Sequence, residues 1–376
     1  MLLFMDGMAH YDTPRIGMKY SVLTQNDCTW AVTAEGRYGN CIKRVATSNG
    51  FAGSYLDIAP LTNRSGVYVP TPSGVFGFAV KVDDLSRIQV DEAGGMVSFF
   101  SVLQGPNWAV KINLNPTGTF SYVQPWGPLN SYGAVMATSA EGLQSGAWSY
   151  VEIKWIINAT TGLIEIRVNT VPVLTFSGDT SSHNPAWFSL GTWNTVRVLN
   201  LQANYTPPNW LTTRHCDLYL ADLTSGDSDD VSDFLGDGVI QCIVPNGPGG
   251  HTDWTPSGTN NWDMVNDRPA PDDDATYNAT TFPGGQDTYN YENIPPLAEV
   301  KGAQMVWLAR KEAEGSATLQ PIVRQGGVDY LGPAQGVASL VYDRYDTQPY
   351  DLNPATMAKF TAAEINSGEF GLRKIL

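Results

Sequence analysis

The chain has 376 residues and a formal charge of −15 at pH 7, because 37 acidic residues outweigh 22 basic ones. That charge would repel a phosphate backbone, and since no run rich in Lys and Arg overrides it, we expect no direct binding of nucleic acid. With 42% hydrophobic and 11% aromatic residues, the chain has ample material for folded cores, which excludes a disordered or fibrous protein.

The N-terminus, MLLFMDGMAHYDT, does not have the pattern of a signal peptide. It carries no positive charge at its start, its apolar stretch is short, and Asp6 follows directly. No segment elsewhere approaches the roughly 18 continuous apolar residues of a membrane span. We therefore expect a protein that is not secreted by a signal peptide and has no membrane partner.

Period-two alternation of apolar and polar residues, bounded by Gly, Pro and Asn, predicts strands from residue 74 onward. The clearest segment is 148–176, which reads as three strands joined by two tight turns. Val151, Ile153 and Trp155 would face a core, while Glu152 and Lys154 would face solvent. Alternation returns at 193–201 and 216–223, so the first half is predicted to be a β-sandwich.

The composition changes at residues 224–230, which are rich in Ser, Gly and Asp. Because a domain holds about 100 to 200 residues, we place a boundary here and expect two domains, 1–224 and 225–376. Strands are expected again at 304–310 and 319–323. The one expected helix follows Thr361, which has the capping-box spacing to Glu364. The predicted fold class is therefore all-β, with one short C-terminal helix.

Several segments together resemble a known class of protein. They are LLFMDGMAHYDT at the start, WSYVEIKWIINATTGLIEIRVN in the middle and CDLYLADLTSGDSDDVSDFLGD at the end of the first half. Shorter motifs follow in order: PNG at 245–247, WTPS at 254–257, PDDDATY at 271–277, ARK at 309–311, RQGGVDY at 324–330 and FTAAEIN at 360–366. The chain resembles tailed-bacteriophage virion structural proteins with a concanavalin-like or laminin G-like jelly-roll domain. This resemblance implies a jelly roll at 1–224 followed by a smaller β-rich phage structural domain.

Jelly rolls also include glycoside hydrolases, which need two carboxylates about 5 to 10 Å apart. The best predicted strands instead place Glu152 beside Lys154 and Glu165 beside Arg167. Paired carboxylates occur only in turn-like stretches. We therefore expect no catalytic residues and no enzyme activity.

The histidines and cysteines also predict no metal site and no catalytic centre. His10, His183, His215 and His251 lie far apart, without the spacing of a zinc site and without a serine in a nucleophile elbow. Cys28, Cys41, Cys216 and Cys242 form no CxxC motif, and we favour free thiols, although a bridge between Cys28 and Cys41 stays open.

Acidic loops leave calcium as the one metal to consider, because hard cations take oxygen ligands. The first candidate cluster is Asp227, Asp229, Asp230 and Asp233, and the second is Asp272, Asp273 and Asp274. Asp also starts turns and stays solvated there, and we favour that interpretation, with no cofactor.

Tryptophans beside Pro, Gly or Asn are the candidates for an interface or for stacking on sugars, since exposed aromatic rings serve both purposes. They are Trp108, Trp126, Trp187, Trp193, Trp210, Trp254 and Trp262. Trp155 and Trp307 lie inside strong strand patterns and are expected to be core residues.

The leading hypothesis is a non-catalytic structural component of a bacteriophage virion, either a capsid decoration or a fibre-like protein. Its expected partners are other virion proteins from the capsid, neck or tail. Because virions are symmetric, we expect a homo-oligomer and favour a trimer. The alternative is a carbohydrate-binding module for host glycans, and a glycoside hydrolase is the third hypothesis.

Overall fold

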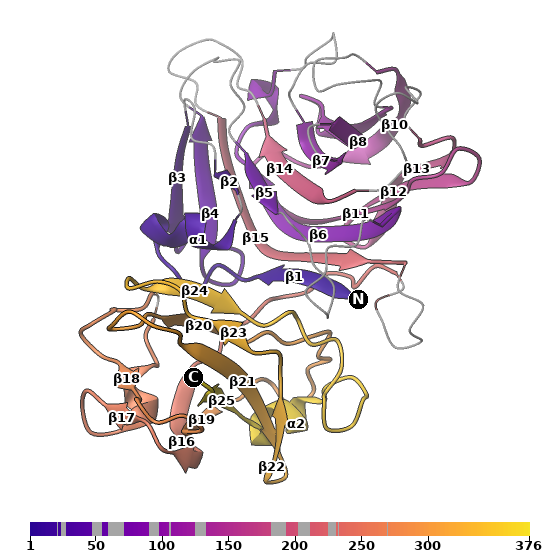
Figure 1. Cartoon of the computed structure of the whole chain (residues 1–376). Coiled ribbons are helices and arrows are strands. Elements are labelled where there is room, and N and C mark those ends of the chain that lie inside the picture. Colours follow the sequence, from indigo (N-terminus) through magenta and orange to yellow (C-terminus); the bar gives the residue numbers. More distant parts are fainter. Residues whose placement is uncertain are drawn as a thin grey trace. The chain divides into compact units, whose positions relative to one another are not determined.

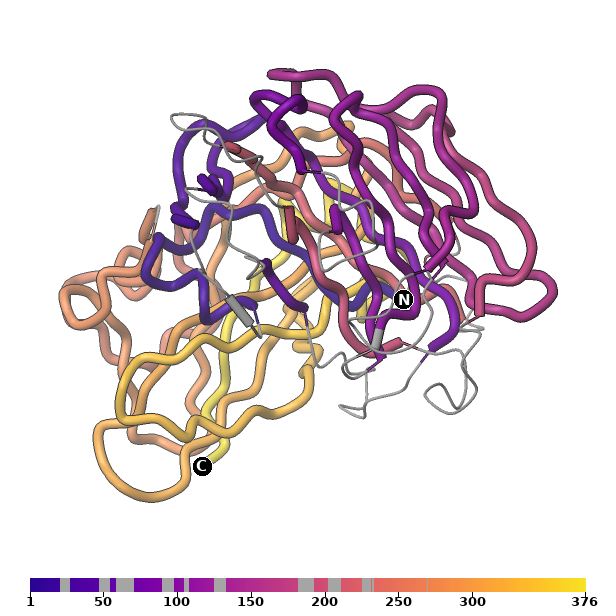
Figure 2. The backbone as a smooth tube through the Cα atoms, turned by 90° about the horizontal axis from the view of Figure 1, so that it is seen from above, coloured from indigo at the N-terminus to yellow at the C-terminus, as the bar shows by residue number. Residues whose placement is uncertain are grey.

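The structure is a computed structural model that describes residues 1–376 except 21, 24–27, 47–54, 59–70, 90–97, 105–106, 125–132, 182–192, 202–210, 225–230, 232 and 269. It has two compact units (Figure 1), and Figure 2 follows the backbone of each. Unit 1 holds nearly all of residues 1–240, and unit 2 holds Gln241–Leu376 with Leu2 and Ala9–Tyr11. The units divide after Ile240, later than the boundary expected at residue 224.

Unit 1 contains an eight-stranded antiparallel sheet with the order β13-β12-β11-β6-β15-β4-β3, and β1 also pairs with β15. In chain order its strands are β1 (Leu2–Asp6), β3 (Cys28–Thr33), β4 (Cys41–Ala46), β6 (Ser73–Val82), β11 (Trp148–Ile156), β12 (Gly162–Val168), β13 (Val171–Gly178) and β15 (Leu211–Asp222).

The second sheet of unit 1 has seven strands in the order β10-β9-β8-β7-β14-β5-β2. These are β2 (Val22–Leu23), β5 (Leu56–Ile58), β7 (Ser98–Gln104), β8 (Asn107–Leu114), β9 (Thr119–Val123), β10 (Val135–Gly142) and β14 (Thr195–Asn200). Unit 1 also has the 3-10 helices η1 (Thr13–Arg15) and η2 (Leu85–Arg87) and the short helix α1 (Ile16–Lys19), which the sequence did not predict.

Aromatic side chains join the two sheets of unit 1. Phe76 on β6 lies against Phe100 on β7, with ring centroids 5.4 Å apart, and Phe78 lies 5.4 Å from Phe99. Trp155 on β11 is fully buried and lies 5.5 Å from Phe100. Two sheets packed face to face form the predicted β-sandwich of the jelly-roll type, and the all-β fold class is confirmed.

The three strands predicted in 148–176 are present, and their register follows the alternation of the sequence. Ile153 pairs with Ile166 and Trp155 with Ile164, so the apolar positions share one face. The turn between β12 and β13 places Asn169 and Thr170 at φ values of 50° and 70°, which are typical of a two-residue hairpin loop.

The expectation that Glu152 faces solvent is wrong, because its side chain is only 1% exposed. The hydroxyl of Tyr219 donates to Glu152 Oε1 at 2.5 Å, and the backbone N–H of Gly236 donates to the same oxygen at 2.8 Å. Gly236 belongs to residues 233–240, which we call the strap. Burial under the strap raises the pKa of Glu152.

Unit 2 is built on a six-stranded antiparallel sheet with the order β16-β19-β25-β21-β22, and β23 also pairs with β21. Its strands are β16 (Pro245–Thr252), β19 (Gln286–Tyr291), β21 (Thr318–Gln325), β22 (Val328–Leu331), β23 (Gln335–Gly336) and β25 (Glu369–Lys374). Two further two-stranded sheets pair β17 (Thr255–Pro256) with β18 (Asn278–Ala279) and β20 (Val306–Ala309) with β24 (Asp343–Asp346). The remaining elements are the 3-10 helix η3 (Asn261–Met264) and α2 (Ala362–Ser367).

One face of the six-stranded sheet is apolar. Val323 and Phe370 form a core cluster with Phe360 and Ile365, the latter from α2. The predicted capping box is confirmed, because the Thr361 side chain accepts from the Glu364 N–H and the Glu364 side chain accepts from the Thr361 N–H. The opposite face carries mostly polar side chains, with Ile322 and Leu331 among them.

Candidate functional site

The structure places the tryptophan candidates in different surroundings. Trp108 and Trp193 are buried, at 3% and 1% exposure, and Trp193 packs 5.2 Å from Trp155. Trp254 is half-buried and donates its Nε1–H to the Gly285 carbonyl at 3.1 Å, while Trp262 is half-buried in η3. Trp126, Trp187 and Trp210 lie outside the described residues.

The calcium candidates are only partly described, because Asp227, Asp229 and Asp230 lie outside the described residues. Asp233 forms an ion pair with Lys154 at 3.0 Å, and Asp274 forms one with Arg310 at 2.8 Å. Asp272 accepts hydrogen bonds from Thr276, as a turn residue does, and Asp273 next to it has a φ of 57°. Across the described ranges, no group of three or more His, Cys, Asp or Glu residues is arranged to hold a metal ion.

The four cysteines are free thiols. Cys28 and Cys41 lie at opposite ends of the β3–β4 ladder, where Cys28 pairs with Ala46 and Cys41 with Thr33, so no bridge joins them. His215 is fully buried, and this burial lowers its pKa to about 3. His10 is half-buried near the N-terminus, and His183 lies outside the described residues.

The outer face of the seven-stranded sheet carries a set of uncharged polar side chains that the sequence analysis did not single out. Asn113 on β8 pairs across the ladder with Ser121 on β9, and Ser121 pairs with Thr138 on β10. Cross-strand partners share a face of a sheet. We call this set the hydroxyl–amide strip, and its members are Asn113, Asn115, Thr117, Thr119, Ser121 and Thr138.

Hydrogen bonds connect most of the hydroxyl–amide strip. Asn115 Nδ2 donates to Thr119 Oγ1 and to Ser121 Oγ, both at 3.0 Å, and Ser121 Oγ lies 3.1 Å from Thr138 Oγ1. The Asn113 carbonyl oxygen, Oδ1, is buried and has no hydrogen-bond partner in the described part of the chain. A buried acceptor without a donor is rare in folded proteins.

The same face continues toward β5 as a row of cross-strand partners. Arg197 on β14 pairs with Asp57 on β5 and with Ser101 on β7, and Ser101 pairs with Lys111 on β8. The Arg197 guanidinium binds the Asp57 carboxylate through two hydrogen bonds of 2.8 Å. Lys111 is buried, with its ammonium 4.4 Å from the centre of the Trp108 ring. The charges of this row are thus held within the fold.

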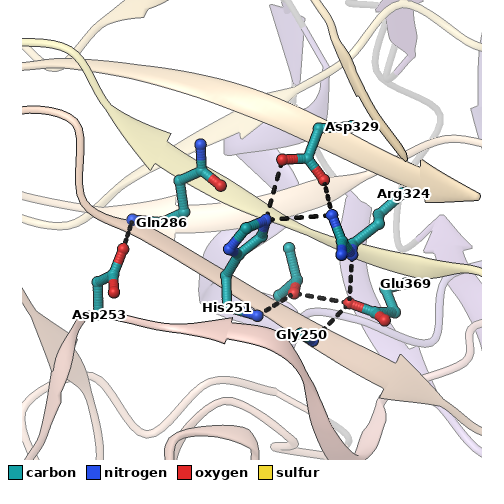
Figure 3. Close-up of polar contacts among 8 residues, drawn as sticks. Gly250, His251, Asp253, Gln286, Arg324, Asp329 and Glu369 are labelled. Carbon is teal, nitrogen blue, oxygen red and sulfur yellow. Dashed lines mark hydrogen bonds and ion pairs between the residues drawn. The ribbon is translucent and has the colours of Figure 1, made fainter. Parts of the chain in front are cut away.

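A second polar site lies on the polar face of the sheet in unit 2 (Figure 3). Glu369 on β25 pairs across the ladder with Arg324 on β21, and Arg324 pairs with Asp329 on β22. Asp329 accepts from Arg324 Nη1 at 2.5 Å and lies 2.9 Å from His251 Nε2. We call these four residues, His251, Arg324, Asp329 and Glu369, the His251 cluster.

A bulge in β16 brings His251 to this cluster. The register between β16 and β19 shifts between Pro248 and Thr252, and Gly249 and Gly250 lie within the shift. A Cβ atom on Gly249 would lie 2.5 Å from the backbone carbonyl of Thr288, so only glycine allows this approach. The Gly250 N–H then donates to Glu369 Oε2 at 2.7 Å.

The charged groups of the His251 cluster pair with one another. Burial would raise the pKa of Asp329, but hydrogen bonds from Arg324 and His251 outweigh it and lower that pKa below its usual value. Thr288 Oγ1 donates to Glu369 at 2.8 Å rather than to the imidazole, so the histidine does not activate this hydroxyl. The cluster therefore fastens the bulge of β16 to β21, β22 and β25.

A separate buried network surrounds Asp287 on β19. Its carboxylate accepts from Tyr289 Oη and from Asn261 Nδ2, both at 2.7 Å, and Asn278 Nδ2 donates to the same tyrosine oxygen at 2.9 Å. Burial raises the pKa of Asp287 to about 6, although the hydrogen bonds from Asn261 and Tyr289 act against it. Its second oxygen, Oδ1, has no hydrogen-bond partner within the described residues.

Comparison with known proteins finds no matching family model and no matching curated protein. Solved structures do resemble the chain. Alginate lyase Aly36B is 11% identical over 58% of this chain and 96% of its own, with a TM-score of 0.38. The carbohydrate-binding module CBM66 from Bacillus subtilis is 12% identical over 53% and 94%, with a TM-score of 0.29. Lectin I from Ulex europaeus is 10% identical over 54% and 95%, also with a TM-score of 0.29.

The expectation that the chain is not an enzyme is corrected by the resemblance to an alginate lyase. That expectation rested on the lack of paired carboxylates, which hydrolysis of a glycosidic bond requires. A lyase breaks its bond by elimination, so a missing carboxylate pair does not exclude it. Within the described residues, no helix is long and apolar enough to cross a membrane.

Replacing Asp329 by Asn should destabilise unit 2 at pH 7 by about 1 to 3 kcal/mol, because Arg324 and His251 lose a charged partner. The lowered pKa stabilises the fold above the ordinary Asp range, and this contribution disappears as the pH falls through the folded-state pKa. Denaturant unfolding at pH 7 and in strong acid measures the difference. Asp274→Asn, at an exposed ion pair, is the matched control and should have a much smaller effect. An Asp329→Asn deficit that is equally large in strong acid would contradict this role.

The raised pKa of Asp287 predicts the opposite pH dependence. Its ionised form is penalised in the fold, so unit 2 should lose up to about 3 kcal/mol as the pH rises from about 4 to about 6. Asp287→Asn should remove this slope, whereas Asp272→Asn, at an exposed turn, should retain it. Unfolding curves collected across that pH window provide the measurement, and an unchanged slope in Asp287→Asn would refute the assignment.

Proposed function

We propose that the chain is a structural protein of a bacteriophage particle that binds glycans through unit 1. The hydroxyl–amide strip is the observation that carries the glycan part. Sugars present hydroxyl groups that both donate and accept hydrogen bonds, and amide and hydroxyl side chains can do the same. Thr117 and Thr138 are exposed, so the strip meets solvent.

Hydrogen bonds within the strip strengthen this proposal. The neighbouring hydroxyls of Ser121 and Thr138 already lie within hydrogen-bond distance of each other. A ligand would therefore meet a surface whose side chains are oriented before binding, which reduces the entropy lost on association.

The motifs in the second half of the chain support a place on a phage particle. In the structure they form connected parts of unit 2: the PNG motif begins β16, the WTPS motif contains β17, and the FTAAEIN motif runs into α2. The RQGGVDY motif forms the β21–β22 hairpin and supplies Arg324 and Asp329 of the His251 cluster. Motifs that occur in a fixed order and also pack together are expected of one structural module.

The proposed partners are neighbouring virion proteins of the capsid, neck or tail. A part of a symmetric particle is expected to be a homo-oligomer, and a trimer fits both three-fold capsid positions and fibres. A capsid decoration and a fibre-like projection are the two forms that this proposal takes.

Thr138→Ala should weaken binding to glycans on an array about fivefold, because one hydrogen bond contributes about 1 kcal/mol. Thr161→Ala, at the exposed turn between β11 and β12, is the matched control and should bind like the wild type. Chain-length analysis of the bound glycans in the same experiment would report cleavage. A wild-type protein that binds no glycan, or a Thr138→Ala variant that binds equally well, would contradict the proposal.

Mass spectrometry of purified phage particles tests the virion part. We expect the protein at a constant copy number per particle, in a simple ratio to the major capsid or tail protein. If the protein is lost from particles during purification while capsid and tail proteins stay, this part of the proposal fails.

A further inference from the structure

We infer that the hydroxyl–amide strip selects neutral glycans and rejects glycans that carry carboxylate or sulfate groups. This inference rests on the proposed glycan binding and names its ligand class. It follows from the charges on the three strands that carry the strip and from the partners of those charges.

The strands that carry the strip contain few charged residues. β8 contributes Lys111, β9 contributes none and β10 contributes Glu141. Lys111 is fully buried, with its ammonium against the Trp108 ring, whereas Glu141 is exposed. The charge that these strands present to solvent is therefore negative.

An acidic glycan would need a cation on the protein, most effectively an arginine that binds its carboxylate through two hydrogen bonds. Arg197 is the arginine of the adjoining row, and both of its hydrogen bonds of 2.8 Å go to Asp57. A carboxylate brought to the strip would lose water without gaining a charged partner, which is costly. The chain's charge of −15 adds repulsion at longer range.

A neutral glycan meets none of these costs. Its hydroxyl groups match the uncharged donors and acceptors of Asn115, Thr119 and Thr138. Hydrogen bonds between neutral groups depend little on salt, so binding should persist at high ionic strength.

Native gels that contain dissolved polysaccharides test this inference with the full chain. Galactomannan, mixed-linkage β-glucan and dextran represent neutral polymers, and alginate, polygalacturonate and hyaluronan represent acidic ones. The wild-type protein should be retarded by at least one neutral polymer and by no acidic one, at both low and high salt. Thr138→Ala should weaken that retardation about fivefold, because the strip loses one exposed hydroxyl group.

A charge variant provides a second readout. Thr138→Lys should create retardation by acidic polymers that disappears as salt is added, since it places a cation on the strip. Thr161→Lys adds the same charge at the turn between β11 and β12 and should not create this retardation.

The possible outcomes distinguish selectivity for neutral glycans from glycan binding itself. Retardation by neutral polymers that Thr138→Ala weakens supports the inference. Retardation of the wild type by acidic polymers alone overturns the neutral class but retains glycan binding. No retardation by any of the six polymers counts against the glycan function itself.

Discussion

The aromatic layer between the two sheets of unit 1 determines the direction of the other side chains in those sheets. Phe76 faces Phe100, and Trp155 contacts both Phe100 and Trp193. Because side chains alternate along a strand, an inward position fixes its neighbours as outward ones, and a slip by one residue would reverse both faces. Asn113 and Ser121 therefore lie on the outer face because the aromatic rings occupy the inner one.

The sequence allowed good predictions wherever the determining pattern is local. Alternation within 148–176 gave three strands with the correct inward residues, because the period of a strand is visible in the strand itself. The capping box at Thr361 and Glu364 was equally accessible, since both partners lie within one turn of α2.

Glu152 shows where local reasoning fails. Its alternation with Val151 and Ile153 predicts an outward side chain, and the direction is correct, but the strap covers that face. Gly236 lies 84 residues further along the chain, and no pattern within β11 predicts that it contacts Glu152. Burial thus depended on a long-range contact, whereas orientation did not.

The residues of the two candidate sites also differ in how far the sequence predicts that they lie close together. Arg324 and Asp329 flank the Gly326-Gly327 turn of a hairpin, so their proximity could have been foreseen. His251 joins them only because a bulge in β16 shifts its register. The hydroxyl–amide strip is visible in the sequence as a pattern, since Asn113, Asn115, Thr119 and Ser121 occupy alternate positions in NLNPTGTFS. The prediction of contact residues was limited to tryptophans and did not include this pattern.

The strap has a consequence for where unit 1 ends as a folding unit. Phe234 lies under the Arg167 guanidinium, 3.9 Å from its carbon, and the Ile240 N–H donates to the buried Asp217 carboxylate at 2.8 Å. A polypeptide that stopped at residue 224 would keep every strand of both sheets. It would nevertheless expose Glu152 and Tyr219 to water and leave Asp217 without this donor. The fold of unit 1 thus includes the strap as well as the two sheets and extends to Ile240.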